Sequence, residues 1–159
     1  MRYESLRVVE HLGYPAQRVR LLPMPAKVTR FEDLVAWQRA ADLAQAVYAA
    51  TDCKPLISDR ALSDQLRRAA VSVPANIAEG FERGTRAQFH HFLSIAKASC
   101  AEIRSHIQVG RRVHRIDDER AVALLRRAEE LALIIGKLRS VVGRQRRTPT
   151  HTSSLMPHT

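Results

Sequence analysis

The chain has 159 residues, of which 26 are Lys or Arg and 16 are Asp or Glu, so its formal net charge is +10 at pH 7. This length predicts one domain with a sizeable core, and the basic excess favours nucleic acid first and an anionic membrane second as partner. No run approaches the roughly 20 apolar residues of a membrane span, no signal-peptide core opens the chain, and the two cysteines fit no metal or redox spacing. We therefore expect a soluble, cytoplasmic protein that does not bind membranes.

Residues 1–30 contain three prolines, show no sustained hydrophobic period, and hold six basic and two acidic side chains. These features predict a poorly ordered, basic N-terminal arm. Met24 is an alternative start of the protein, and the sequence leaves that choice open.

The first long helix is predicted from about 31 to 50, with Glu32 and Asp33 at the positive end of its dipole. Two apolar seams lie side by side on it. One consists of Leu34, Trp37, Ala41, Ala44 and Tyr48, and the other of Ala36, Ala40, Leu43 and Val47. A loop follows, in which Pro55 blocks continuation of the helix.

The second helix is predicted from about 59 to 83, with Ser58 or Asp59 as its N-cap and Gly84 as its closing residue. Pro74 lies inside this helix and predicts a kink, because it lacks a backbone donor and clashes with the preceding turn. The run is mostly apolar, yet polar side chains recur on one face at steps of three and four. They are Gln65, Arg68, Ser72, Asn76, Glu79 and Arg83.

We interpret this polar face as a structural network, because buried polar groups must find partners and such networks fix the register between helices. Its predicted members are Gln65, Arg68, Ser72, Asn76, Glu79, Ser99 and Glu102. They are expected to bond to one another and to the backbone at the kink, with Arg67 or Arg68 as the counter-ion of a glutamate. The alternative is a ligand or RNA pocket at the kink.

The third helix is predicted from about 85 to 114 and opens with a capping box at Thr85 and Gln88. Its core face consists of Phe89, Phe92, Ala96, Ile103 and Ile107. About 110° round the helix, at 100° per residue, lies a straight basic stripe. The stripe consists of Arg86, His90, Lys97, Arg104, Arg111 and Arg115.

This stripe is the best candidate for binding nucleic acid, because evenly spaced guanidinium groups can follow a phosphate backbone. Residues 85–116 hold six basic side chains and one acidic one, whereas a solvated helix face normally mixes the two signs. The absence of interleaved aromatic residues argues against base stacking, so weak sequence selectivity is expected. The alternative is a solvated helix face.

The fourth helix is predicted from about 118 to 143 and has the cleanest heptad seam of the chain. The seam consists of Leu124, Ala128, Leu131, Ile135, Leu138 and Val142. Residues 144–159 have the composition of a disordered basic tail, in which Arg144, Arg146 and Arg147 would extend the nucleic-acid contact.

Four amphipathic helices with short connections predict an all-α domain over residues 31–143, an antiparallel, up-down four-helix bundle with a Pro-kinked second helix. Several helices have apolar residues on more than one side. Because a monomeric bundle buries only one face of each helix, the surplus predicts a homo-oligomer.

Three segments resemble a known family: FEDLVAWQRAADLAQAVY, LSDQLRRAAVSVPANIAEGFERGT and QFHHFLSIAKASCAEI. They are similar to the small four-helix proteins encoded in intervening sequences of bacterial 23S rRNA genes, over about residues 31–142. The related accessory variability proteins of diversity-generating retroelements share the bundle. The specific marker is SxxxNIAEG, here Ser72 and Asn76 to Gly80, and SxxE at Ser99 is a weaker one.

This resemblance implies a ring-like homopentamer without an established enzymatic activity. For the retroelement relatives it implies a basic, nucleic-acid-binding accessory of a reverse transcriptase.

The residues themselves give no support to a metal site, a cofactor or an enzyme. A di-iron bundle needs Glu-x-x-His on two helices, whereas Glu102 and His106 are four residues apart and have no second copy. Neither cysteine has a helical His one turn away to activate it. Three hypotheses remain: a nucleic-acid-binding module, an accessory subunit of a protein such as a reverse transcriptase, and an enzyme, for which a metal in the purified protein would be the first sign.

Overall fold

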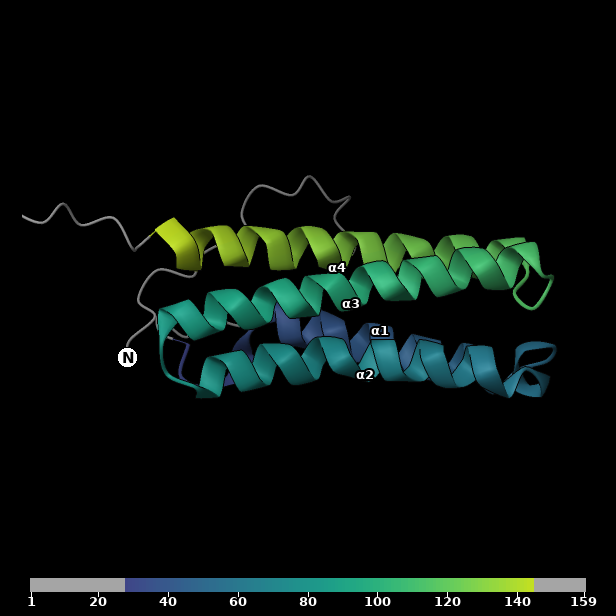
Figure 1. The fold of residues 1–159 in the computed structure, drawn as a ribbon, viewed down its shortest axis with the longest axis horizontal. Helices are drawn as coiled ribbons and strands as arrows, with labels where there is room; N and C mark the ends of the chain where they lie inside the picture. The colour runs from purple at the N-terminus through teal and green to yellow at the C-terminus, as the bar shows by residue number, and fades with distance from the viewer. Residues whose placement is uncertain (1–27, 145–159) are drawn as a thin grey trace, which may run out of the picture.

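The computed structural model describes residues 28–144, and in this part four long helices lie antiparallel to their neighbours in the chain (Figure 1). They are α1 (Val35–Thr51), α2 (Arg60–Glu82), α3 (Arg86–Arg112) and α4 (Asp118–Arg144), with short 3₁₀ helices at η1 (Phe31–Asp33) and η2 (Leu56–Ser58). Each helix packs against the next, and α4 also contacts α1. The predicted all-α, up-down four-helix bundle is confirmed.

The start of the first helix differs from the prediction. Leu34 has extended backbone angles, φ −74° and ψ 121°, so α1 begins only at Val35 and has no side-chain cap. The residues before it form η1, where the ring of Phe31 lies edge-on to Trp37 with the centroids 5.3 Å apart. The two acidic residues of the predicted first turn therefore precede α1.

The core follows the predicted heptad seams, which become buried because they are the apolar faces that the helices turn toward one another. The α4 seam from Leu124 to Val142 is buried throughout. Of the two seams predicted for the first helix, the one that includes Leu43 is buried, whereas in the other only Leu34 is buried and Tyr48 is 41% exposed. On α3 the half-buried Phe92 lies at the margin, with the guanidinium of Arg83 5.0 Å above its ring.

The second helix runs through its proline and packs closely on α3. Asp59 caps it by accepting from the Leu62 backbone N–H at 3.1 Å, as predicted, and Gly84 after its end has a φ of 71°. Pro74 lies inside continuous α2. A Cβ on Gly80 would lie 2.6 Å from the Cβ of Phe92 on α3, so only glycine permits this approach.

The N-terminal arm up to residue 27 and the tail from residue 145 lie outside the described residues, as do Arg146 and Arg147. Arg144, predicted as the first residue of the tail, is instead the last residue of α4.

Candidate nucleic-acid interface

Three members of the predicted polar network bond to one another across the α2–α3 contact. The Asn76 amide donates to the Ser72 carbonyl at 2.7 Å and to the Ser72 hydroxyl at 3.0 Å. The Ser72 and Ser99 hydroxyls share a hydrogen bond of 2.9 Å, and Ser99 donates to the Ile95 carbonyl at 3.3 Å. We call Ser72, Asn76 and Ser99 the serine–asparagine cluster. The cluster joins two helices and its Ser99 is buried, as a structural network requires, and its structural role stays a prediction.

The rest of the predicted network does not join this cluster. Gln65, Arg68 and Glu102 are exposed. Glu79 pairs with Arg83 on its own helix at 2.5 Å, rather than with the α3 side. The predicted seven-residue network is therefore too large, because α3 covers only the middle of the polar face of α2.

The Arg67 side chain also differs from its predicted role as counter-ion of Glu79 or Glu102. It lies between α1 and α2, where it donates to Asp52 at 2.6 Å and to the Thr51 hydroxyl at 2.8 Å. Its guanidinium also lies 5.0 Å above the ring of Tyr48. Arg67 therefore joins α2 to the end of α1.

The basic stripe of α3 lies along its seam with α4. A Cβ on Gly143 would lie 3.2 Å from Cδ2 of His90, and one on Gly136 would lie 3.8 Å from Nζ of Lys97. Arg104 then meets Glu129 at 3.3 Å. The facing pairs are therefore His90 with Gly143, Lys97 with Gly136, and Arg104 with Glu129. Each step of seven residues forward on α3 corresponds to seven residues backward on α4, as expected for antiparallel helices in heptad register.

One half of the stripe is neutralised by acids of other segments. The ion pairs are Arg104–Glu129 at 3.3 Å, Arg111–Asp118 at 2.5 Å and Arg115–Asp59 at 3.5 Å. Arg115 also lies beyond the end of α3. The expectation of a basic stripe without acidic partners is therefore wrong for these three residues, because the prediction counted the acids of α3 alone.

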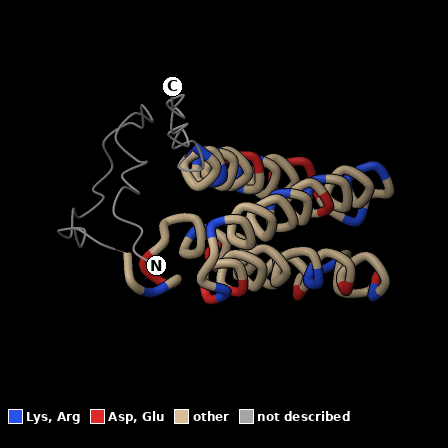
Figure 2. Tube along the Cα trace, turned by 60° about the vertical axis from the view of Figure 1, so that its left-hand side comes forward, with Lys and Arg blue, Asp and Glu red and all other residues tan. Residues whose placement is uncertain are grey.

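The other half of the seam contains no acidic residue on either helix. No Asp or Glu occurs on α3 from Arg86 to Ala101 or on α4 from Leu131 to Arg144. Because the two helices are antiparallel, these halves lie side by side at one end of the bundle, and Figure 2 shows the charged residues along them. The bases there are Lys97, Lys137, Arg139 and Arg144, together with His90 and His91, while Arg86 at the start of α3 already has an interaction partner. We call these two half-helices the basic end; Glu79 and Glu82 of α2 and Glu32 and Asp33 of η1 lie at the same end of the bundle, outside the α3–α4 seam.

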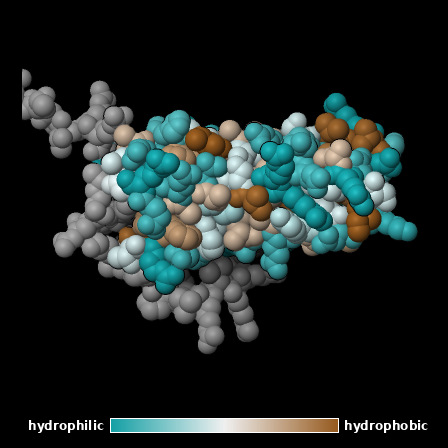
Figure 3. All heavy atoms as spheres, turned by 60° about the horizontal axis from the view of Figure 1, so that its bottom comes forward, coloured by the Kyte–Doolittle hydropathy of each residue, from teal (hydrophilic) through white to brown (hydrophobic). Residues whose placement is uncertain are grey.

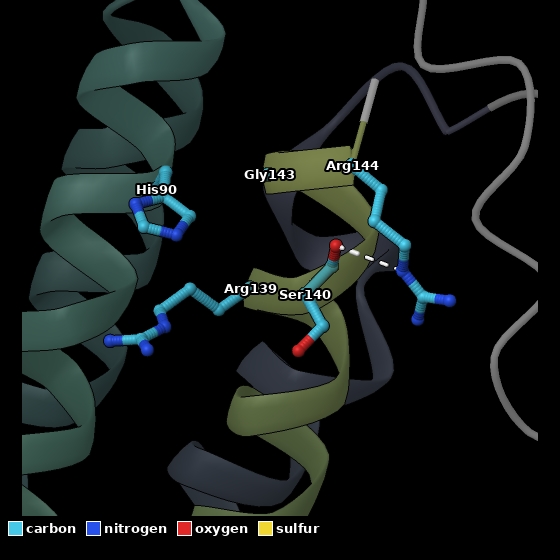
Figure 4. A pocket seen from close by; sticks show the side chains of 5 residues that line it. All are labelled: His90, Arg139, Ser140, Gly143 and Arg144. Atoms are coloured by element: carbon cyan, nitrogen blue, oxygen red, sulfur yellow. Dashed lines mark hydrogen bonds between the residues drawn. The ribbon is translucent and has the colours of Figure 1, made fainter. Parts of the chain in front are cut away.

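The basic end contains a shallow hollow at the α3–α4 seam, with a volume of about 430 Å³. Its lining residues are His90, Arg139, Ser140, Gly143 and Arg144. Figure 4 shows the side chains of His90 and Arg139 extending into the space between the helices, while the Arg144 guanidinium extends from another side of α4. The structure thus brings His90 near Arg139, which sequence reasoning missed because Arg139 is not on the α3 stripe.

Between residues 28 and 144, no three His, Cys, Asp or Glu side chains are grouped as metal ligands. Burial raises the pKa of the Cys100 thiol to about 12, with Arg104 opposing the shift, so this thiol stays protonated at neutral pH. In the same part of the chain, none of the helices has both the length and the apolar character of a membrane span.

The fold and the charge distribution define a small α-helical bundle whose most distinctive surface is its basic end. Residues 32–137 match the family model of the 23S rRNA-intervening sequence protein, and the chain belongs to this family. Curated proteins yield no match.

A solved structure from Bacteroides thetaiotaomicron VPI-5482 is similar to the chain. It is described as a protein with unknown function from the S23 ribosomal protein family. It matches with a TM-score of 0.58 and 20% identity, covering 65% of this chain and 97% of that one. At this identity the likeness shows the fold alone.

Proposed function

We propose that this protein is a non-enzymatic module that binds nucleic acid, RNA or DNA, through its basic end. The observation that supports the proposal is the pairing of two acid-free half-helices at the α3–α4 seam. With no carboxylate on either half-helix, the phosphates of a nucleic acid are suitable counter-ions for Lys97, Lys137, Arg139 and Arg144.

The chemistry of the basic end favours contact with phosphates over readout of bases. Its cations are Lys and Arg on two rigid helices, and Arg can contact a phosphate through two parallel hydrogen bonds. The two phenylalanines of this half of α3 are not available as stacking platforms, because Phe89 is buried and Phe92 is half-buried beneath Arg83. Binding should therefore depend strongly on salt and weakly on sequence.

The test is binding of the full chain to structured RNA and to duplex DNA over a salt series. The variant Lys97→Gln/Lys137→Gln removes two exposed charges of the basic end, one on each helix. Its matched control is Arg104→Gln/Arg126→Gln, which removes two charges from the same helices where each Arg has an acidic partner. We expect the first variant to reduce the slope of log K against log salt by about two units and the control to change it little.

Two results would contradict the proposal. Equal loss of slope in both double variants would mean that binding follows net charge and not the basic end. No binding even at low salt would leave the basic end a solvated surface, and protein partners would then be the better hypothesis.

We also propose that the protein assembles into a homo-oligomer through the α2–α3 face, with a pentamer as the size that the family resemblance implies. Figure 3 shows hydrophobic residues exposed on the side of the molecule that points downward in Figure 1. Val71 of α2 and Ile95 of α3 are 44% and 36% exposed, and both adjoin the serine–asparagine cluster. Apolar side chains that are exposed beside polar ones are typical of a protein–protein interface, so this face is suited to contact with a second copy of the chain.

Light scattering on the purified protein tests this assembly. We expect a mass several-fold above the monomer's 17.9 kDa, and a smaller mass for Val71→Lys/Ile95→Lys, which places charges on the proposed interface. A monomer at micromolar concentration would contradict the proposal.

A further inference from the structure

The hollow at the basic end has the lining of an anion site. Figure 4 shows the Arg139 guanidinium and the His90 imidazole extending into it, whereas the Arg144 guanidinium points away and the Ser140 hydroxyl donates to the Gly136 carbonyl at 3.0 Å. None of the described residues that line the hollow is acidic. A guanidinium group donates hydrogen bonds and accepts none, and an imidazole can also donate. An oxyanion in the hollow would therefore meet Arg139 of α4 and His90 of α3 as donors, and no acidic side chain among the described residues that line it.

Arg139 is held in a defined position across the seam. Its Nη1 donates to the Ser94 hydroxyl of α3 at 3.0 Å, and that hydroxyl donates to the His90 carbonyl at 3.1 Å. This connection uses one of the five N–H groups of the guanidinium. A guanidinium that is already positioned loses less conformational entropy when it binds a ligand.

Gly143 sets the position of the imidazole. A Cβ at this residue would lie 3.2 Å from Cδ2 of His90 and 3.4 Å from its Nε2. The imidazole of His90 therefore lies directly against the α4 backbone, one turn beyond Arg139. Both side chains then border the same hollow, as Figure 4 shows.

We infer that this hollow is a subsite for one phosphate group of a nucleic-acid strand, held by Arg139 and His90. The inference rests on the proposed function for the source of the phosphate. Arg139 donates to the phosphate oxygens through its remaining N–H groups, and His90 donates from the α3 side. The hollow is shallow and open, which suits a phosphate on a polymer better than a small molecule that needs enclosure.

The experiment titrates inorganic phosphate into the full-length protein at constant ionic strength, with chloride as the compensating ion. The histidine ring resonances are followed by NMR, and His90→Gln assigns the resonance of His90. We expect a saturable shift of this resonance in the wild type. Arg139→Gln should weaken phosphate binding about tenfold or more, since it removes a charged hydrogen-bonding partner.

Lys137→Gln is the matched control, because it removes one positive charge two residues away on α4, outside the residues that line the hollow. It should leave the shift nearly unchanged. Arg139→Gln also removes the bond to Ser94, so Arg139→Lys is measured beside it. Arg139→Lys keeps the charge, loses the planar fork, and should give intermediate phosphate affinity in a protein with unaltered thermal unfolding.

The outcomes separate this inference from the proposed function. If the His90 resonance does not respond to phosphate while nucleic-acid binding still depends on Lys97 and Lys137, the subsite is refuted and the proposed function stands. Equal phosphate affinity in Arg139→Gln and Lys137→Gln would also refute the subsite. If phosphate binds with the expected variant pattern but neither RNA nor DNA binds, the hollow is a site for free phosphate and the proposed function fails.

Discussion

Substitution of glycine by alanine should change the free energy of unfolding in opposite directions at two helical positions, Gly80 and Gly136. A Cβ on Gly80 of α2 would lie 2.6 Å from Cβ of Phe92 and 3.2 Å from Cδ2 of Phe89. A Cβ on Gly136 of α4 would meet only Nζ of Lys97, at 3.8 Å. Ala at either site is sterically allowed by its own helix, so the two variants differ mainly in the space that the neighbouring helix leaves.

The magnitudes follow from two terms of opposite sign. Alanine in a helix interior is favoured over glycine by about 0.8–1.0 kcal/mol, so Gly136→Ala should raise the free energy of unfolding by about that amount. Gly80→Ala has the same helical gain, but the Cβ of Phe92 is attached to the backbone and cannot rotate away. The α2 and α3 helices must move apart, and overpacking of this kind costs about 1–3 kcal/mol. The two variants should therefore differ in unfolding free energy by about 1–3 kcal/mol.

Urea unfolding followed by circular dichroism measures this difference, with all three proteins at one concentration because assembly would couple stability to concentration. Gly136→Ala serves as the control for helix propensity. A Gly80→Ala protein as stable as Gly136→Ala would refute the close approach of α2 and α3 at this position.

Three further predictions concern other parts of the bundle. Asn76→Ala should lower the free energy of unfolding by about 1–3 kcal/mol, since it removes both donors to Ser72; unchanged unfolding with lost RNA binding would instead indicate a binding role. Since the pKa of Cys100 is raised to about 12, the native protein at pH 8 should take one iodoacetamide label, at the exposed Cys53, and a second only when unfolded; mass spectrometry that finds two labels on native protein would disprove this. Arg104→Gln should change the unfolding free energy by less than about 1 kcal/mol, because its pair with Glu129 is about half-exposed; a larger loss in urea unfolding would show that the pair is structural.

The helices and the core could be predicted because each depends on a pattern within one segment. The seam from Leu124 to Val142 has to be buried wherever α4 packs, so its spacing predicts the inward face of the helix. The cap at Asp59 is equally local. The hydrogen bond between Ser72 and Ser99 could also be predicted, because a buried polar group requires a hydrogen-bonding partner.

What could not be predicted depends on which residues of two helices meet. The periodicity of α3 places Arg104 and His90 on one face of the helix. Only the register between α3 and α4 determines that Arg104 pairs with Glu129, whereas His90 lies against Gly143. Arg139 was missed for the same reason, because its sequence neighbours on α4 are mostly apolar and its role arises from Ser94 on the other helix. Periodicity within one helix contains no information on that register.

The short connection between α3 and α4 is the feature that concentrates charge at one end. The acidic residues of α4 all precede Leu131, and the one acid of α3, Glu102, follows its midpoint. Only five residues, 113–117, separate the helices, which requires an antiparallel pair. In a parallel pair, the acidic first half of α4 would lie beside the acid-free first half of α3, and its carboxylates would offset the positive charge there. The antiparallel turn instead places acids beside the half of α3 that begins at Glu102 and leaves the other half basic, so the basic end is a consequence of topology acting on two uneven charge distributions.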